Sequence, residues 1–573
     1  MSKSSKKRRK KQAAANTASQ DRAHPTPAGS LKLRYAILVG VVYVLAGLAM
    51  KLVAGAYYQN CDPSYAYLFN ILNLLTGYPI DHIDHPGTTL HVLGWLAVPA
   101  IRLLSPFRES TIQNALILHP EFYLNGLNVT ILILVALASV VFYRSVHRAG
   151  RTVPEALMTQ ALPLCFFETY LALYDVKPEP LLLALILGMG AVLVSEYCQT
   201  YNRQWTSVAG PPLLGVLIGL SLMLKITAAP LVLLVFFPRR LWRKSCCFCA
   251  TAITCSALFI LLLPKLAKMK HWYSGLIMNS GTRGSGERGF PSLSTLAGKM
   301  ASVILNAPVF TILAAVLCAL VLLHLFAGRR GKNSRTTGTT SATDRVQNRQ
   351  TLLLIVVLAL QAAIVMRHPL SARYLIPSMA LLPVLLCIVL HAVQHSPSWA
   401  LGKRLYEKRL RLTVVITAVA LSVLCVKFTL EIRYRTRKRQ ENKRADAIVA
   451  ELPTAIVAAN PQSGDNVYAA LLFGNQWAGY CYKGRMEALL KDRRPLIYNM
   501  HNLWTYAGHV SPRAVLKAIT QDKRRIFIKR RVSRKPQEEP FAEGWMYLKP
   551  VMQGQQIGLY EIIGPNPAIL NRR

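Results

Sequence analysis

Acidic residues are scarce in this chain of 573 residues, where 26 Asp and Glu stand against 68 Lys and Arg and leave a net charge of +42. Charged residues of both signs make up only 16% of the sequence, whereas a soluble domain carries roughly 25%. Apolar stretches long enough to cross a hydrocarbon layer of ~30 Å recur over the first three quarters of the chain, and each must be helical to satisfy its backbone hydrogen bonds. The sequence therefore predicts an integral membrane protein with a helical bundle.

Several signals that would point elsewhere are missing. No aromatic-interleaved basic platform accompanies the positive charge, so nucleic acid is not expected as a partner; the basic run 3–11 suits an anionic cytoplasmic leaflet instead. The segment 33–57 follows a long basic arm and lacks a clean cleavage site, which favours an uncleaved first span over a signal peptide. Most cysteines lie in apolar segments, and Cys246, Cys247 and Cys249 lack metal-site spacing with histidine, so they indicate at most acylation near a membrane face.

The Lys and Arg residues near span ends define an orientation with the N-terminus in the cytoplasm, because short cytoplasmic loops are rich in basic residues. Segments 63–77 and 88–104 are expected to lie on the outer membrane surface as amphipathic helices of one large loop. The basic stretch 433–444 fits this orientation worst, since it would lie outside. Eleven spans are expected, over 35–57, 121–143, 155–174, 180–197, 211–224, 226–237, 245–264, 301–326, 351–366, 374–394 and 412–428.

Composition divides the chain into three parts. We expect a basic, disordered cytoplasmic arm over 1–34, an all-α polytopic membrane domain over 35–430, and a small extracytoplasmic α/β domain over 431–573. In the last part, short β-rich runs such as 525–529 and 558–563 alternate with charged helical segments and with Gly and Pro turns. No internal repeat is visible, which weakens a transporter interpretation because many transporters are built from repeats.

The few acidic residues gather on the predicted outer face. Asp62 follows the first span and precedes a proline, where it fits an N-cap and equally a general base that takes a proton from a hydroxyl. Further on, carboxylates and imidazoles are spaced three apart, so that pairs of them share one face of a helical turn. Binding of a sugar or phosphate, a divalent metal site and a plain hydrated turn all stay open for Asp81, His82, Asp84 and His85.

A second charged turn joins the third and fourth predicted spans and holds Asp175, Lys177 and Glu179. Such residues often only anchor span ends, but a cation with two carboxylates also suits a phosphosugar or a pyrophosphate-like ligand. Lys225 interrupts another apolar stretch. Because a charge at the bilayer centre costs at least ~2.5 kcal/mol, we expect a turn between two short helices at this position, where the ammonium could meet a lipid phosphate or simply snorkel to the surface.

Arginines recur in the remaining outer segments. The loop 271–289 is rich in glycine and aromatic residues and carries Arg283 and Arg288, which could neutralise phosphate oxygens. This pattern is neither a Walker loop nor a dinucleotide fingerprint, and a plain flexible loop is the alternative. Arg373 and Tyr374 stand at the outer mouth of a later span.

These motifs in this order resemble the GT-C superfamily of polytopic glycosyltransferases, and they are most similar to the protein O-mannosyltransferase and lipid A aminoarabinose transferase type. The resemblance covers about 35–430. It rests on the first-loop acid, a His-Pro start to the following helix, a second acid after the third span and two later elements, namely Asp62, His85-Pro86, Asp175 or Glu179, Lys225-Ile226-Thr227-Ala228-Ala229-Pro230 and Ala372-Arg373-Tyr374-Leu375-Ile376-Pro377.

The resemblance implies transfer of a sugar from a polyprenyl phosphate-linked donor to an extracytoplasmic acceptor, which is a lipid, a glycan or a protein. Asp62 would be the catalytic base. The family often has an Arg-x-Asp-like pattern at the second acidic position, whereas this chain has Lys177-Pro178-Glu179, so both Asp175 and Glu179 stay candidates. Fixed cations would stabilise the phosphate leaving group of an oxocarbenium-like transition state, and the candidates are Lys177, Lys225, Arg283, Arg288 and Arg373.

Two other classes of protein compete with this interpretation. A transporter or flippase for a lipid-linked anion would place charges near the bilayer midplane, whereas here they cluster outside. A membrane-anchored scaffold would need only one span. We therefore expect an enzyme of the plasma membrane with its active site outside and with membrane lipids, a polyprenyl phosphate sugar and an acceptor as partners. No cofactor is expected, because the lipid-linked sugar is itself the activated donor, and no metal is predicted.

Overall fold

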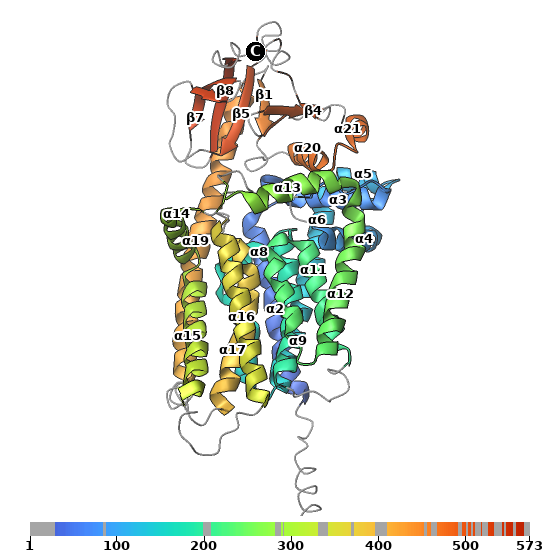
Figure 1. Ribbon diagram of the computed structural model, residues 1–573. Helices are drawn as coiled ribbons and strands as arrows, with labels where there is room; N and C mark the ends of the chain where they lie inside the picture. The colour runs from blue at the N-terminus through green and yellow to red at the C-terminus, as the bar shows by residue number, and fades with distance from the viewer. Residues whose placement is uncertain are drawn as a thin grey trace, which may run out of the picture.

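The computed structural model is an elongated helical bundle with a β-sheet at one end, opposite the end at which helix α2 (Gly29–Ala54) begins (Figure 1). Most of the chain between the first span and the C-terminal sheet is helical, as the sequence predicts. The structure describes residues 29–83, 87–198, 208–280, 288–289, 291–330, 342–367, 372–395, 409–451, 455–459, 467–490, 496–499, 502–505, 508–509, 511, 517, 519, 525–531, 541–543, 546–553 and 557–565.

Over these residues, six helices are long and apolar enough to cross a membrane, and the number rises to eight if each of two bent pairs is one span. Together with the apolar composition this makes the chain an integral membrane protein. The bent pairs are α7–α8 at 75° and α14–α15 at 105°. In chain order the bundle contains α2, α6 (Pro120–Arg148), α7 (Val153–Ala161), η3 (Leu162–Cys165), α8 (Phe167–Leu173), α9 (Pro178–Cys198), α11 (Gly210–Leu224), η4 (Ile226–Phe236), α12 (Leu241–Phe259), η5 (Ile260–Lys265), α14 (Leu293–Asn306), α15 (Pro308–Arg330), α16 (Ala342–Arg367), η8 (Ala372–Leu375), α17 (Ile376–His395) and α19 (Arg409–Ala450).

The bundle has apolar residues both inside and on its outer face. The described side chains of α9 and α17 are mostly buried, whereas α2 and α12 expose large apolar side chains such as Leu38, Leu45 and Ile253. An outward apolar surface of this kind is expected where lipid replaces water as the solvent. Close packing inside depends on small residues: a Cβ on Gly215 of α11 would lie 2.2 Å from the Cys247 carbonyl of α12.

Lys225 separates α11 from the 3-10 helix η4, as expected from a charge within an apolar stretch. Its backbone is extended, with φ −157° and ψ 128°, and the two short helices on either side form a hairpin. This break is a main reason why the expected count of eleven spans differs from the six to eight candidates, since neither half is long enough to count alone.

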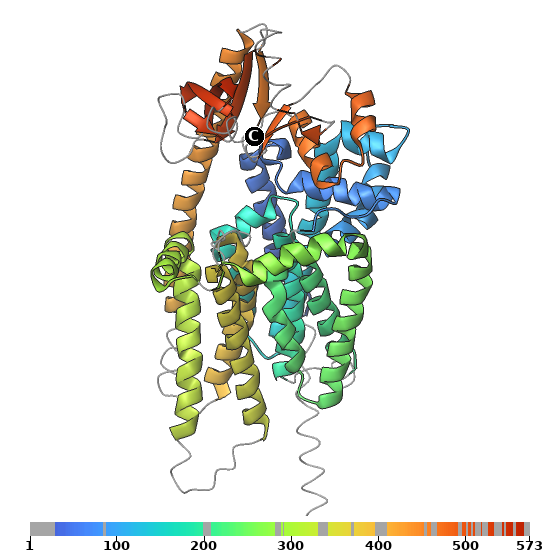
Figure 2. The ribbon, with the colours of Figure 1, turned by 45° about the horizontal axis from the view of Figure 1, so that its top comes forward.

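Short helices cover the sheet end of the bundle. They are η2 (Tyr57–Asn60), α3 (Ser64–Thr76), α4 (Thr88–Leu103), α5 (Ile112–Leu118), α13 (Leu266–Met278), α20 (Val467–Trp477) and α21 (Lys483–Leu489). Figure 2 shows α13 running across the bundle rather than along it. The two segments expected to be surface helices, 63–77 and 88–104, do form α3 and α4, but α3 is buried from Ser64 to Asn73 because α20 packs on it.

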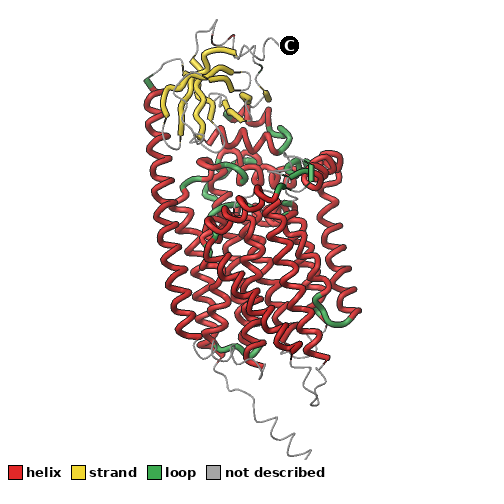
Figure 3. The backbone as a smooth tube through the Cα atoms, turned by 60° about the vertical axis from the view of Figure 1, so that its left-hand side comes forward, coloured by secondary structure: helices red, strands yellow, loops and turns green. Residues whose placement is uncertain are grey.

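The C-terminal part forms an eight-stranded mixed sheet with the order β4-β3-β2-β1-β5-β8-β7-β6. β1 pairs in parallel with β2 and β5, and the other pairs are antiparallel. The long helix α19 reaches this sheet from the far end of the bundle (Figure 3) and packs Ala445 against Phe527 and Leu559. The predicted β-runs become β5 and β8. The strands are β1 (Ala455–Ala459), β2 (Leu496–Asn499), β3 (Asn502–Thr505), β4 (Gly508–His509), β5 (Arg525–Arg531), β6 (Phe541–Glu543), β7 (Met546–Gln553) and β8 (Ile557–Pro565).

Candidate active site

A cavity of about 460 Å³ opens where the bundle meets its covering helices, and we call it the apolar cavity. Aliphatic side chains from η4, α13 and α16 form much of its wall, among them Ile226, Leu276 and Ile364. Its polar lining consists of Asp62, His82, Glu179, Thr227, Trp272, Tyr273, Arg367, Arg373, Tyr374 and Trp477. The cavity therefore combines a wall suited to hydrocarbon with charged and hydrogen-bonding groups.

Some lining residues have buried polar atoms without a hydrogen-bond partner among the described residues. They include Thr227 Oγ1, Arg373 Nε and Trp477 Nε1. A buried polar group left unpaired costs about 1–3 kcal/mol, so such atoms usually have a partner in the working state of a protein. Two N–H donors and a hydroxyl around one cavity suit a ligand rich in oxygen.

The charged wall of the apolar cavity is an ion network in which Lys225 and Glu179 are buried. Lys225 Nζ donates to Glu179 Oε1 at 2.6 Å and lies 3.8 Å from the centre of the Tyr374 ring, while Arg373 Nε is 3.8 Å from the same carboxylate oxygen. Glu179 is in the first turn of α9, where a carboxylate is favoured by the helix dipole. The network brings together four residues that the sequence predicts as site residues, and one carboxylate there holds two cations.

Asp62 lies in the short link between η2 and α3, and this link is fixed by two other carboxylates. Ser64 Oγ donates to Asp175 Oδ1, and Asp175 also pairs with Lys177 Nζ at 3.6 Å. Glu121 accepts from the backbone N–H of Tyr57 and Tyr58 at 2.8 and 2.9 Å and from the hydroxyl of Tyr65. Asp175 and Lys177 line neither cavity, whereas Glu179 lines the apolar cavity.

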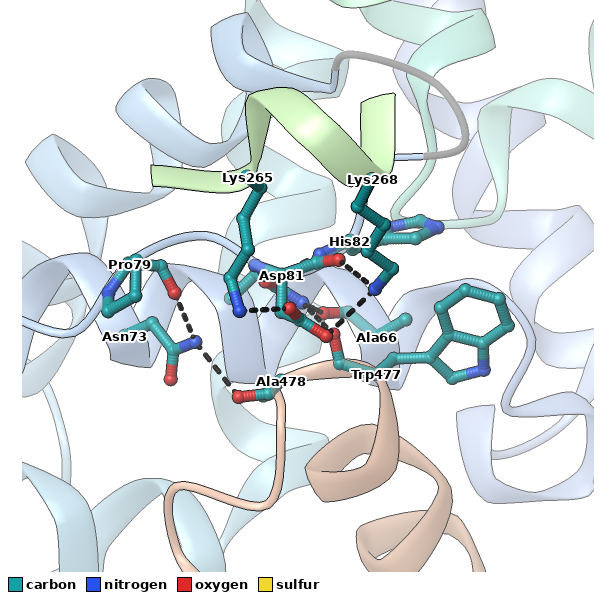
Figure 4. A network of polar contacts seen from close by, with 10 residues as sticks. Ala66, Asn73, Pro79, Asp81, His82, Lys265, Lys268, Trp477 and Ala478 are labelled. Carbon is teal, nitrogen blue, oxygen red and sulfur yellow. Dashed lines mark hydrogen bonds and ion pairs between the residues drawn. The ribbon is translucent and has the colours of Figure 1, made fainter. Parts of the chain in front are cut away.

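The Asp81 cluster is mainly a structural tie. Asp81 pairs with Lys265 of η5 at 2.6 Å and with Lys268 of α13 at 3.0 Å (Figure 4). Asn70 Oδ1 accepts from the backbone N–H of Asp81 and His82. Burial raises the pKa of Asp81, but the hydrogen bonds from the two lysines outweigh it and the pKa lies below its usual value of 3.8. The carboxylate therefore fixes the loop to α13.

His82 is the member of this cluster that reaches the apolar cavity. Its ring is edge-on to Tyr67 at 5.0 Å and to Trp477 at 5.1 Å. Among the described residues no group of three or more His, Cys, Asp or Glu is placed to hold a metal ion. Three further predicted site residues, Asp84, His85 and Arg283, lie outside the described residues.

Trp477 is a lining residue that the sequence did not single out. It ends helix α20, which packs on α3 so closely that a Cβ on Gly474 would lie 2.8 Å from the Tyr65 carbonyl. Arg288, by contrast, is exposed, forms an antiparallel bridge with Asn279 and lines neither cavity. Only contact between segments some 400 residues apart brings Trp477 to the site, and no local pattern indicates it.

A second cavity of about 280 Å³ adjoins the first, and we call it the cationic cavity. Its lining comes from the end of α2, from the link that follows and from α19, and comprises Ala54, Gln59, Asn60, Asp62, Arg373, Tyr434, Arg435, Lys438, Arg439 and Asn442. Asp62 and Arg373 are common to both cavities. The basic stretch 433–444, which fitted the expected topology worst, thus supplies three cations to this cavity.

The chain also matches a known protein family. Residues 115–360 match the model of glycosyltransferase family 87. The predicted resemblance to membrane glycosyltransferases, and with it the class of enzyme, is confirmed by this match. The matched range of the glycosyltransferase contains Asp175, Glu179 and Lys225 but ends before Arg373 and begins after Asp62. No curated protein matches the chain by sequence.

Solved structures resemble the chain over most of their length at low identity. ArnT from Cupriavidus metallidurans in the apo state has a TM-score of 0.46 and 10% identity, and the comparison covers 91% of this chain and 97% of ArnT. The same protein bound to undecaprenyl phosphate gives 0.42 and 11%, with the same shares covered. The Archaeoglobus fulgidus oligosaccharyltransferase in the apo form gives 0.44 and 10%, over 87% of this chain and 69% of that one.

Proposed function

We propose that this glycosyltransferase moves a sugar from a polyprenyl phosphate-linked donor to a hydroxyl of an extracytoplasmic acceptor, with Asp62 as the general base. The observation that carries the proposal is that Asp62 and Arg373 are shared by two cavities of different character. A transferase needs two substrates to meet at one carboxylate and one cation, and this arrangement provides such a place.

The apolar cavity suits the donor. A polyprenyl phosphate sugar joins a hydrocarbon chain to a charged phosphate and a polar ring, and the cavity has an aliphatic wall that includes Ile226 and Ile364 next to Arg373. The Thr227 hydroxyl and the Trp477 N–H, which find no partner within the described part of the chain, would bind oxygens of the sugar or phosphate. The acceptor then enters from the cationic cavity on the other side of Asp62.

In the proposed reaction the acceptor oxygen attacks C1 of the sugar while Asp62 takes the hydroxyl proton. The bond between C1 and the phosphate oxygen breaks, and its electron pair leaves with the polyprenyl phosphate. Arg373 stabilises the charge on that leaving group, since a fixed cation next to developing charge costs no reorganisation in the transition state. No cofactor takes part, because the phosphate linkage already activates the sugar.

In this proposal Asp175 and Glu179, the two candidates for the second acidic position, act through other residues. Glu179 holds Lys225 and Arg373 at the donor phosphate, and Asp175 holds the start of α3 through Ser64 so that Asp62 stays between the cavities. Both are positioning residues. Lys177, bonded to the Leu171 carbonyl and to Asp175, supports the same turn.

We further propose that both cavities lie on the extracytoplasmic side of the plasma membrane and that the N-terminus is cytoplasmic. The short basic loops, which include Arg148 at the end of α6 and Arg243 at the start of α12, belong to the end of the bundle opposite the sheet (Figure 1). The eleven expected spans are retained if the bent pairs, the α11–η4 hairpin and α19 are counted as crossings.

The test compares Asp62→Asn with the parent chain in membranes supplied with polyprenyl phosphate hexoses, measuring both sugar transfer and release of polyprenyl phosphate. We expect a fall in turnover of about 10²–10⁴-fold with donor binding retained, because general-base catalysis contributes that much. Asp446→Asn is the matched control, since that carboxylate is half exposed on α19 and lines neither cavity. Full activity of Asp62→Asn would refute the assigned base, and inactivity of the parent with every such donor would refute the donor class.

A further inference from the structure

We propose that the cationic cavity binds a phosphate group carried by the acceptor next to the hydroxyl that receives the sugar. The identification of this ligand as the acceptor rests on the proposed function, whereas binding of a phosphate in the cavity does not. The proposal thus names the chemical class of a substrate that neither the family match nor the donor chemistry specifies.

The first support is the charge of the lining. Arg373, Arg435, Lys438 and Arg439 surround a space in which Asp62 is the one carboxylate among the lining residues that the structure describes. Phosphate oxygens form short, charge-assisted hydrogen bonds with guanidinium and ammonium groups, which are the strongest that side chains offer. A neutral acceptor would leave this excess of positive charge without a role.

Part of that charge has a structural task. Arg435 uses all three nitrogens, with Nε on Glu431 at 2.6 Å, Nη1 on the Ala54 carbonyl at 3.4 Å and Nη2 on the Tyr174 hydroxyl at 3.2 Å. It ties α19 to the end of α2, where cations are favoured next to the last carbonyls. Each nitrogen of Arg435 therefore already has a partner within the protein, and the proposal does not depend on this residue.

Lys438 and Arg439 are in a different position. Lys438 Nζ donates to the Gln59 carbonyl at 3.1 Å, and Arg439 Nη2 donates to the Val53 carbonyl at 3.0 Å. An ammonium has three donors and a guanidinium five, so both side chains can bind a carbonyl and a phosphate at once. Arg435 already donates to a carbonyl at the end of α2. The positive charges of Lys438 and Arg439 are therefore more than this helix end requires.

An independent observation comes from Asn442, one turn further along α19. Its side chain lines the cavity, the residue is 2% exposed, and its Oδ1 has no hydrogen-bond partner among the described residues. A buried amide oxygen of this kind accepts from a hydroxyl. A ligand with a phosphate for Lys438 and Arg439 and a neighbouring hydroxyl for Asn442 satisfies all three, and Asp62 at the same cavity receives the proton of a second hydroxyl.

The test measures equilibrium binding to the purified full chain in phosphatidylcholine nanodiscs. One arm uses dihexanoyl phosphatidylglycerol, which carries a phosphate beside two hydroxyls in a lipid headgroup, and another uses glycerol phosphate as a free phosphate ester. Dihexanoyl phosphatidylcholine and glycerol are the matched probes without net negative charge. We expect saturable binding of at least one phosphate probe. Binding of the lipid alone would mean that the site takes a lipid headgroup, and binding of both probes would mean that it takes a phosphate ester of any source. Absence of binding by both, or equal binding of the uncharged probes, overturns the proposal.

The matched variants are Lys438→Gln with Arg439→Gln, against Arg433→Gln, an exposed residue of the same helix that lines neither cavity. Each lost cation is expected to weaken phosphate binding by about tenfold, and Arg433→Gln should leave it unchanged. Equal loss in the control, or no loss in the double variant, contradicts the site. Lys438→Arg should restore binding, which separates loss of charge from misfolding.

The proposed function and this site can fail separately. Asp62→Asn removes the assigned base but also removes the carboxylate that opposes an anion, so it should bind the phosphate probe at least as tightly as the parent. Phosphate binding with no sugar transfer in any assay would contradict the proposed function alone. Sugar transfer that is unaffected by Lys438→Gln and Arg439→Gln, together with unchanged binding, would contradict the site alone.

Discussion

Removal of the Glu179 carboxylate is expected to destabilise the bundle strongly, quite apart from its effect on activity. Glu179 and Lys225 are 3% and 1% exposed and their charged atoms are 2.6 Å apart. Breaking a buried ion pair from one side typically costs about 3–5 kcal/mol, because the remaining charge stays buried without compensation. In Glu179→Gln the buried charge that loses its partner is that of Lys225, and Arg373 lies close by. A cost of about 3–5 kcal/mol is therefore expected.

The assay is reversible unfolding of the purified chain in mixed micelles, followed by helix content. Glu179→Gln and Lys225→Met should each lose about 3–5 kcal/mol of unfolding free energy, whereas the double variant should lose about 2 kcal/mol less than their sum, since contacting residues couple. Glu561→Gln is the control: its partner Arg525 is 43% exposed on the sheet, and exposed pairs contribute about 0–1 kcal/mol. Additive single effects within about 0.5 kcal/mol would refute the reasoning.

Three further outcomes are expected. Asp81→Asn should lower the free energy of unfolding at pH 7 by about 1 kcal/mol, because the pair with half-exposed Lys268 is screened. Since the folded-state pKa lies below 3.8, the difference from the parent should be full above that value and shrink steadily as the pH falls below it, and a difference that does not shrink with falling pH would contradict the tie. Gly474→Ala should displace α20 and reduce turnover at least tenfold, or by about 1.4 kcal/mol of activation free energy, through loss of Trp477 contacts. Gly484→Ala, with open space around it, should have no effect. Arg288→Gln should leave turnover within about twofold, as for an ordinary exposed residue; a larger loss would place that loop at the substrate.

Sequence reasoning succeeded where the decisive signal is local. The break at Lys225 follows from one charge in an apolar stretch, and the helices near 63–77 and 88–104 and the strands near 525–529 follow from their own periodicity. The charged turn at 175–179 was also recognised, because carboxylates and a lysine are rare so close together in a membrane protein. What these patterns could not supply is the partner of each charge.

The site itself depends on contacts between distant segments. Asp81 fixes its loop because it pairs with Lys265 and Lys268, which lie far from it in the sequence. Helix α3 is buried because α20, some 400 residues later in the chain, packs on it. The basic stretch 433–444 was noticed only as a misfit to the charge rule for loops. That misfit was the usable signal, since basic residues that stand against the charge rule for loops usually have another function.

Helix α19 also constrains how this protein can change. Its 42 residues correspond to about 63 Å at 1.5 Å per residue, roughly twice the hydrocarbon thickness. One stripe of this helix first lines the cationic cavity and then packs on the sheet. Its residues follow one another at steps of three and four, namely Arg435, Lys438, Asn442 and Ala445. A single inserted residue between these points would turn one function away from the other by about 100°. The length of this segment is therefore more tightly constrained than its individual residues.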